Sequence, residues 1–422
     1  MAGLSGFRWL IAGLLFLASA LSFFDRQVLS VLAPRILADL RLSNIEYSHA
    51  VSAFTLAYSV MFTVGGRFVD LAGTRRGLGL CVVFWTIASF LHAAAQSAAH
   101  LTAFRFLLGV GEGGCFPGAA KGILEWFPRS ERALAMGLAT TGGSAIGAVL
   151  APPLIVAADH IAGWRGAFVI TGLIGVTWAA AWFVFFQTPE KSRFVSEAER
   201  DLVLSQRDAG EVAGTGETWP LAVLLGRREV WGFVATRFLL DPVFYFYMFW
   251  IPQYLSQERH ASIEDIGRLS WIPFLTLGIA SLLGGALSDR LVRAGWPVGR
   301  TRKTVMAGAA FLTPVSILAL IAPDSFWAVV LLGVLMFAHG FWMTNYMTLI
   351  SDLFPPSTLA TVVGLSGTAG GLGGFLSSLA IGRIVEAASF APVFVVCGLL
   401  YPAGLAIILL TVRRVERLSR VG

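Results

Sequence analysis

The sequence predicts an all-α membrane protein of twelve transmembrane helices arranged as two six-helix pseudo-repeats. Hydrophobic residues make up 56% of its 422 residues and charged residues only 13%, whereas soluble domains carry about 25% charged residues. Twelve apolar runs approach or exceed the roughly 20 helical residues needed to cross a bilayer, and the second half repeats features of the first. We therefore expect a multi-pass membrane protein.

Each apolar run is expected to form one membrane-spanning helix. In chain order the runs are residues 9–33, 47–69, 77–97, 100–124, 134–157, 165–187, 230–254, 265–289, 303–322, 326–350, 359–385 and 388–411. Only helices and closed barrels satisfy every backbone group in lipid. Barrel strands would alternate in polarity over about ten residues, and these runs are longer and uniformly apolar, which favours helices.

Basic residues in the connections predict the orientation of these helices. They concentrate in the loops that follow even-numbered runs and in the C-terminal tail: Arg75, Arg76, Arg129, Arg132, Lys191, Arg193, Arg200, Arg207, Arg227, Arg228, Arg290, Arg293, Arg300, Arg302, Lys303, Arg413, Arg414, Arg417 and Arg420. Short loops rich in Lys and Arg stay in the cytoplasm. Both termini are therefore predicted to be cytoplasmic. The net charge of +6 is explained in the same way, and no nucleic-acid partner is expected.

An internal repeat divides the chain. Residues Glu125–Val149 match Asp352–Leu376 at a constant separation of 227 residues. The matching pairs are Phe127/Phe354, Pro128/Pro355, Ser130/Ser357, Ala133/Ala360, Gly137/Gly364, Thr141/Thr368, Gly143/Gly370 and Gly147/Gly374. We expect an N-terminal half (1–187), a cytoplasmic linker (188–229) and a C-terminal half (230–422). Parallel repeats are typical of alternating-access transporters, which bind substrate near the midplane.

A second repeated element carries a family resemblance. The stretch "GRFVDLAGTRR" (Gly66–Arg76) resembles the loop motif of the major facilitator superfamily, except that Leu71 replaces a basic residue. The C-terminal copy, "GALSDRL", has Arg290 at that position. The resemblance implies a gating loop that helps to hold the outward-open state. The acidic and basic residues to which it assigns this role are Asp70, Arg75, Arg76, Asp289 and Arg290.

Charged residues inside the apolar runs are the main functional candidates, because charge at the bilayer centre is costly. They are Asp25, Arg26, Arg105, Glu112, Lys121, Arg237 and Asp241. Arg105 and Glu112 are seven residues apart, so they face nearly the same side of one helix. Glycines and Pro117 interrupt that helix, which is typical of a helix that lines a central cavity. Arg237 and Asp241, four residues apart, are expected to pair within their helix.

Two chemical roles fit these residues. A guanidinium binds a carboxylate through two parallel hydrogen bonds and stays protonated when desolvated, so Arg26 and Arg105 suit an anionic substrate. A carboxylate in an apolar cavity can take up a proton near neutral pH, so Asp25 and Glu112 suit proton coupling. The alternative is structural: Arg105 pairs with Glu112 or Asp25, and the two acids serve only as counter-ions.

A closer resemblance supports the functional interpretation. The stretch "FFDRQ", Tyr58, "RFLLGVGEGGCFPGAAK" and "FYMFWIPQYL" resemble the anion:cation symporter branch, which includes bacterial hexuronate and galactonate transporters and the vesicular and lysosomal organic-anion carriers. The resemblance implies that Arg26, Tyr58 and Arg105 bind substrate and that Asp25 and Glu112 carry protons. Polar groups on second-half helices add weaker substrate-binding candidates: Tyr245, Gln253 and Asn345.

The expected function is proton-coupled import of a small organic anion by alternating access, with a sugar acid such as a hexuronate or aldonate as substrate. Another small carboxylate, such as an aromatic acid, or exchange of an organic phosphate remains an alternative. We expect no enzymatic activity, because no nucleophile–base pair, metal-ligand spacing or phosphate-binding loop is present. We expect transport to be driven by a proton gradient and to need no cofactor or metal. The protein is expected to be a monomer, surrounded by lipid, in the cell inner (cytoplasmic) membrane.

Overall fold

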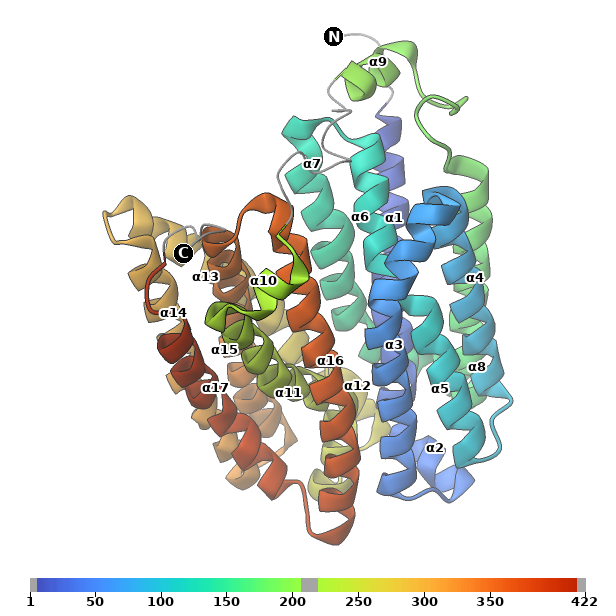
Figure 1. Ribbon diagram of the computed structural model, residues 1–422. Coiled ribbons are helices and arrows are strands. Elements are labelled where there is room, and N and C mark those ends of the chain that lie inside the picture. The colour runs from blue at the N-terminus through green and yellow to red at the C-terminus, as the bar shows by residue number, and fades with distance from the viewer. Residues whose placement is uncertain (1–5, 206–218, 416–422) are drawn as a thin grey trace. The chain divides into compact units, whose positions relative to one another are not determined.

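Figure 1 shows the computed structural model of the chain, which describes residues 6–205 and 219–415 apart from the side chains of residues 129, 130, 133, 356, 357 and 360. The described residues form helices and connecting loops, with no β-strand among them. The chain divides into two compact units, Met1–Val212 and Ala213–Gly422. Within the predicted linker 188–229, residues 206–218 lie outside the described residues.

The N-terminal unit is an antiparallel helical bundle (Figure 1). Its elements are α1 (Phe7–Val31), α2 (Ala33–Leu40), α3 (Asn44–Ala72), α4 (Thr74–Ala93), α5 (Ala98–Glu112), α6 (Cys115–Trp126), α7 (Arg129–Met136), the π-helical η1 (Gly137–Gly142), α8 (Gly143–Phe185) and α9 (Glu197–Ser205). Helix α1 packs along α8, and α3 packs along α5. A capping box between Ser43 and Glu46 satisfies exposed N–H groups at the start of α3.

The run at residues 100–124 forms two helices instead of one. Helix α5 ends at Glu112, and α6 begins at Cys115. The two residues between them allow neighbouring helices to approach closely: a Cβ on Gly113 would lie 2.5 Å from the Cβ of Met61, and one on Gly114 would lie 2.6 Å from Cys81 Sγ. The interruption that the sequence predicts therefore lies before Pro117, and it leaves Glu112 at the end of a helix.

Helix α8 contains two arms joined at Gly163, whose backbone has φ 69° and ψ 175°. A positive φ is readily adopted by glycine because it lacks a Cβ. The predicted runs 134–157 and 165–187 fall on either side of this residue, so the expected connection is a single sharp bend.

Helix α9 ties part of the predicted linker to the N-terminal unit. The Glu199 carboxylate accepts the backbone N–H groups of Phe7 and Arg8, both at 3.1 Å, and the Arg8 guanidinium at 2.8 Å. Arg8 also pairs with Glu131 of α7 at 2.8 Å. A carboxylate at a helix N-terminus satisfies N–H groups that have no partner within the helix, so Glu199 fixes the start of α1.

The C-terminal unit is a second helical bundle. Its elements are α10 (Leu221–Leu225), α11 (Arg228–Arg259), α12 (Ile263–Leu269), α13 (Ile272–Arg293), α14 (Val298–Leu312), the 3₁₀-helical η2 (Thr313–Ile321), α15 (Ser325–Leu353), α16 (Pro356–Ala387) and α17 (Ala391–Thr411). Helix α13 packs along α15, and α11 packs along α16. The runs 265–289 and 303–322 each form two segments, whose later pieces begin just before Pro273 and Pro314, consistent with the missing proline N–H.

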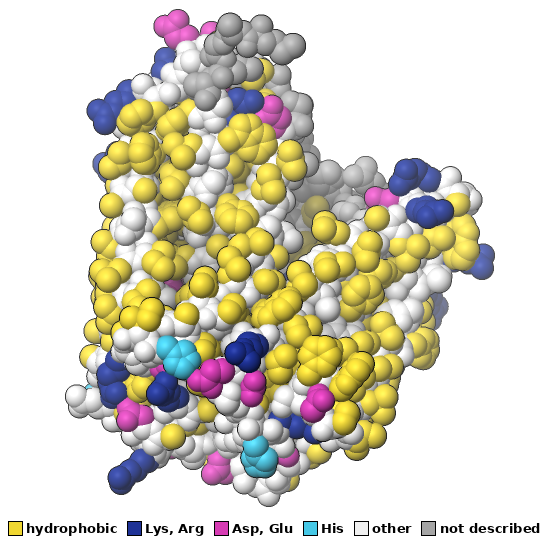
Figure 2. All heavy atoms as spheres, turned by 180° about the vertical axis from the view of Figure 1, so that it is seen from behind, with side chains coloured by type: hydrophobic (Ala, Val, Ile, Leu, Met, Phe, Trp, Pro, Cys, Tyr) yellow, Lys and Arg dark blue, Asp and Glu magenta, His cyan; other side chains and the backbone are white. Residues whose placement is uncertain are grey.

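Nine helical segments of the described residues are long and apolar enough to cross a membrane. Large hydrophobic side chains are strongly exposed on both units, among them Ile161 at 81% and Leu282 at 78%. Figure 2 shows that the visible surface between the ends of each unit is mainly hydrophobic and that charged side chains gather near those ends. Such a surface is stable in lipid and costly in water.

Candidate functional site

Four of the charged candidates from the apolar runs are buried inside the N-terminal unit. Asp25 and Arg26 lie on α1, and Arg105 and Glu112 lie on α5. Their exposed fractions are 2%, 3%, 1% and 0%. Buried charges are stable only when they pair or bind other groups, so their partners indicate what the site can do.

Arg26 and Glu112 form an ion pair between α1 and α5. Arg26 Nε donates to Glu112 Oε2 at 2.6 Å, and the hydroxyl of Ser22 donates to the same oxygen at 2.9 Å. Arg26 Nη2 also donates to Ser22 Oγ at 3.2 Å. The acid therefore pairs with Arg26, although its sequence spacing had favoured Arg105 as a possible partner. Ser22 was missed because a serine in a membrane helix carries no distinguishing sequence signal.

Aromatic rings surround the Arg26 guanidinium. Its Cζ lies 4.3 Å from the ring centre of Tyr58, 4.7 Å from that of Phe23 and 5.5 Å from that of Phe54. Cation–π attraction is strongest where water is excluded. The structure thus brings together Tyr58 of α3 and Arg26, two residues to which the family resemblance assigns substrate binding. It also places Phe54 beside both arginines, since Arg105 Cζ lies 5.8 Å from that ring.

Arg105 has a different environment. Its Nη2 donates to the backbone carbonyl of Arg26 at 3.2 Å, while its Nε and Nη1 have no hydrogen-bond partner among the described residues. Glu112 Oε1 also has none. A buried donor without an acceptor is costly, and more so when it is charged. Arg105 therefore presents N–H donors from two nitrogens, which lie on different edges of the guanidinium, to acceptors from outside the chain.

Asp25 points away from its neighbour in the sequence. Its Oδ1 accepts the Ser89 hydroxyl of α4 at 3.1 Å, and Ser89 contacts Thr171 of α8 at 3.3 Å. Adjacent helical residues point about 100° apart, so Asp25 and Arg26 face different helices. Asp25 is thus held by hydroxyl groups and forms no ion pair with any residue that the structure describes.

The polar candidates of the second half lie on two helices of the C-terminal unit. Asn345 is 1% exposed on α15, and its Nδ2 donates to the Phe341 carbonyl at 2.9 Å and the Gly284 carbonyl at 3.4 Å. Gln253 is 1% exposed on α11. Tyr245, also on α11, stacks on Phe249 with 6.2 Å between ring centres. An amide inside a helix needs partners, and Asn345 has found two backbone carbonyls.

The gating candidates of the first half have separate partners. Asp70 pairs with Lys121 of α6 at 3.2 Å, and Arg75 donates to the carbonyl of Phe183 at 2.5 Å. Arg76 is exposed. The structure therefore pairs the motif acid with a lysine from the fourth apolar run, and the two arginines of the loop lie elsewhere.

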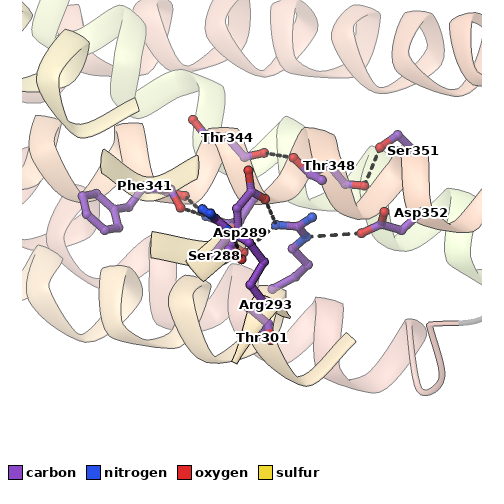
Figure 3. A network of polar contacts seen from close by, with 12 residues as sticks. Ser288, Asp289, Arg293, Thr301, Phe341, Thr344, Thr348, Ser351 and Asp352 are labelled. Atoms are coloured by element: carbon purple, nitrogen blue, oxygen red, sulfur yellow. Dashed lines mark hydrogen bonds and ion pairs between the residues drawn. The ribbon is translucent and has the colours of Figure 1, made fainter. Parts of the chain in front are cut away.

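The equivalent C-terminal cluster is centred on Arg302. This guanidinium lies 3.6 Å from Asp289 and 3.3 Å from Asp352, and it donates to Ser288 at 2.5 Å. Figure 3 shows Ser288, Asp289 and Asp352 close together, while Arg290 is exposed. Arg302 was not singled out from the sequence as a gating residue. The internal repeat contained the signal, because aligning the two halves at a separation of 227 residues matches Arg302 to Arg75.

Comparison with known proteins identifies the family. The family model for the Major Facilitator Superfamily matches residues 15–378 and 246–421, and the chain belongs to that family. It is 31% identical to the hexuronate transporter of Escherichia coli (strain K12) over 94% of this chain and 92% of that one. It is 29% identical to a probable galactarate/D-glucarate transporter of Bacillus subtilis (strain 168), over 90% and 86% of the two chains.

A solved structure shares the fold. A bacterial homolog of the human lysosomal transporter Spinster, in an inward-facing conformation, superposes with a TM-score of 0.71 at 20% identity, over 97% of this chain and 96% of that one. The protein is therefore a multi-pass membrane transporter with the all-helical major facilitator fold, and it is not an enzyme.

Proposed function

We propose that this protein imports a sugar acid, such as a hexuronate or aldonate, together with protons by alternating access. The observation that carries the proposal is Arg105, whose buried guanidinium keeps two N–H groups without a partner beside the Arg26–Glu112 pair. Nη2 gives one hydrogen to the Arg26 carbonyl, and its other hydrogen forms a fork with Nε or Nη1 that matches the two oxygens of a carboxylate. Relatives that are named as transporters of hexuronate and of galactarate/D-glucarate support a sugar acid as the substrate class.

The remaining polar candidates are assigned to the sugar hydroxyls. Tyr58 lies against Arg26, so it is suited to a hydroxyl next to the bound carboxylate. Asn345, Tyr245 and Gln253 are proposed to contribute from the second half. Sites that bind hydroxyl groups through hydrogen bonds reject analogues that lack them, so these residues are expected to affect substrate choice more than overall transport.

Charge balance motivates the proton step. When both acids are ionised, the negative charges of Asp25 and Glu112 balance the positive charges of Arg26 and Arg105. A bound monocarboxylate then gives the cluster a net charge of about −1. One proton on an acid restores neutrality, and a neutral cluster is the least costly in lipid-enclosed surroundings. We assign this proton to Glu112 or Asp25. Its arrival at Glu112 also weakens the hold on Arg26 and frees it for substrate.

In the proposed topology the chain crosses the membrane twelve times, and both termini lie in the cytoplasm. The membrane is proposed to be the inner membrane of the cell. Helix α3, the α5–α6 pair and the second arm of α8 would add three spans to the nine apolar segments. Residues 1–187 and 230–422 would be the moving halves of a monomer. The ion pairs of Asp70 and Asp289 are proposed as elements of the cytoplasmic gate, with Arg75, Arg76 and Arg290 at the adjacent membrane surface.

Uptake by the purified protein in liposomes tests the proposal. Radiolabelled galacturonate should accumulate inside when the external solution is acidified, and a protonophore should abolish the accumulation. Unlabelled sugar acids, benzoates and sugar phosphates should then be compared as counterflow partners. Benzoate or sugar phosphate exchange without sugar-acid exchange would replace the proposed substrate class, and uptake that ignores the pH gradient would refute proton coupling.

A further inference from the structure

The C-terminal unit contains a largely buried ion pair that the proposed site does not use. Arg237 and Asp241 lie one turn apart on α11. Arg237 Nε donates to the two carboxylate oxygens at 3.1 and 2.9 Å, and its Nη2 donates to Oδ2 at 2.6 Å. The exposed fractions of the two side chains are 18% and 9%. Within this unit the carboxylate therefore occupies the position that an anionic ligand of Arg237 would take.

Glycines of α16 provide the space around this pair. A Cβ on Gly370 would lie 1.9 Å from Asp241 Oδ2, and a Cβ on Gly367 would lie 3.6 Å from Arg237 Nη1. Any side chain at Gly370 would thus fill the space in which the carboxylate lies. Arg237 Nη1 has no hydrogen bond within the described part of the chain. The guanidinium therefore has one edge occupied by Asp241 and one free donor beside a glycine backbone.

The other helices bring weakly ionising groups to the pair. Helix α15 contributes His339 and Tyr346, α17 contributes Tyr401, and α11 itself contributes Tyr245. His339 and Tyr401 contact each other through Nδ1 and the hydroxyl, and the Tyr346 hydroxyl donates to the Phe233 carbonyl at 2.8 Å. Helix α16 contributes the glycines described above. Arg237 and Asp241 are thus the strongly charged groups of this cluster.

We propose that Arg237 is a second carboxylate-binding site, within the C-terminal unit, and that Asp241 is the proton-dependent plug that closes it. The ligand class rests on the proposed function. A proton from solution adds to the Asp241 carboxylate, which ceases to be an anion and releases Arg237. The Nε and Nη2 donors then bind the carboxylate of the sugar acid. One proton and one carboxylate enter together, so the net charge of the site is unchanged.

A purely structural role explains the pair less well. Replacing a buried ion pair with apolar side chains of similar volume is often neutral or stabilising, so helix packing alone does not require these charges. The pair is also open to competition, because a carboxylate ligand offers Arg237 the same two oxygens that Asp241 offers. Since Arg237 and Asp241 lie on the same helix, the ligand carboxylate can replace the Asp241 carboxylate without a rearrangement of the helices.

Calorimetric titration of the purified full-length protein with galacturonate tests the site. Wild type should bind one ligand tightly and a second one weakly, and the weak affinity should rise by up to tenfold per pH unit as the solution is acidified from about pH 7.5 to about pH 5.5. Asp241→Asn should show the weak event at both values. Arg105→Gln should lose the tight event and keep the weak one.

A charge-free double variant serves as the control for folding. Arg237→Met combined with Asp241→Leu leaves no unpaired charge, so it should fold and lose only the weak event. A single event in wild type at both pH values, with none gained in Asp241→Asn, would overturn the second site and leave the proposed function intact. A weak event that persists in the double variant would also overturn it. Absence of galacturonate binding in every variant would refute both proposals.

Discussion

Replacing Arg105 should separate ligand binding from folding. Arg105→Gln removes one hydrogen bond, to the carbonyl of Arg26, together with a buried cation that has two donors without partners. Hydrogen bonds to charged groups contribute about 1.5–3 kcal/mol each. Loss of two such bonds to a substrate carboxylate, about 3 kcal/mol or more, weakens galacturonate binding by at least roughly 100-fold. Without substrate, the stability of the variant should match or exceed that of wild type.

Arg26→Gln is the matched comparison. This change leaves Glu112 buried without its cation, and breaking a buried pair typically costs about 3–5 kcal/mol. Thermal unfolding in detergent should therefore show a large loss of stability for Arg26→Gln and none for Arg105→Gln, while galacturonate titration shows weak binding for both. The assignment of Arg105 to the substrate fails if Arg105→Gln unfolds as early as Arg26→Gln and still binds within threefold of wild type.

Three further changes probe coupling, an ion pair and packing. Glu112→Gln should abolish accumulation on a pH gradient yet keep counterflow exchange in liposomes, and continued concentrative uptake would exclude this acid as the coupling group. The hydrogen bond from Arg165 lowers the pKa of Asp39 in the folded protein. The pair therefore stabilises the fold at pH values above the pKa that Asp39 has in the unfolded chain, and this stabilisation is lost as the pH falls through its pKa in the folded protein. The stability deficit of Asp39→Asn should therefore shrink in thermal unfolding as pH is lowered from about 7 toward about 3, and a deficit independent of pH would contradict this. Gly113→Val places a Cβ 2.5 Å from the Cβ of Met61 and should lower the unfolding free energy by about 1–3 kcal/mol or more. Wild-type stability in that variant would show that the helices separate easily.

The sequence identified which charged residues lie in the membrane helices of the N-terminal unit, but it did not identify how they pair. Arg26, Arg105, Glu112 and Asp25 were identifiable because charge is rare in apolar runs. Their partners depend on how helices distant in sequence pack, so the spacing of Arg105 and Glu112 suggested a contact that Arg26 makes instead. Local contacts were more predictable, and the i,i+4 pair of Arg237 and Asp241 is one example that the structure confirms.

Helix interruptions were predictable in kind and less so in position. The glycines and Pro117 indicated a break in the run 100–124, and the structure places it at Gly113 and Gly114. Its position follows from contacts with Met61 and Cys81, which a single run of sequence does not reveal. The role of Ser22 had no sequence signal, because serine and threonine are common in membrane helices. Their hydroxyl groups usually donate to the backbone of their own helix.

The Arg26–Glu112 pair also has a consequence for biosynthesis. The two residues are separated by 86 positions, which take roughly 4–17 s to synthesise at about 5–20 residues per second. The first helix therefore enters the membrane region before its permanent counter-charge exists. Asp25 is the only acid in the segment Phe7–Val31, so it is the sole carboxylate that the nascent helix can offer Arg26 during this interval. Because Asp25 and Arg26 carry opposite charges, the middle of the first helix has no net charge while the chain is still on the ribosome. This neutrality lasts until α5, which carries Glu112, has been synthesised.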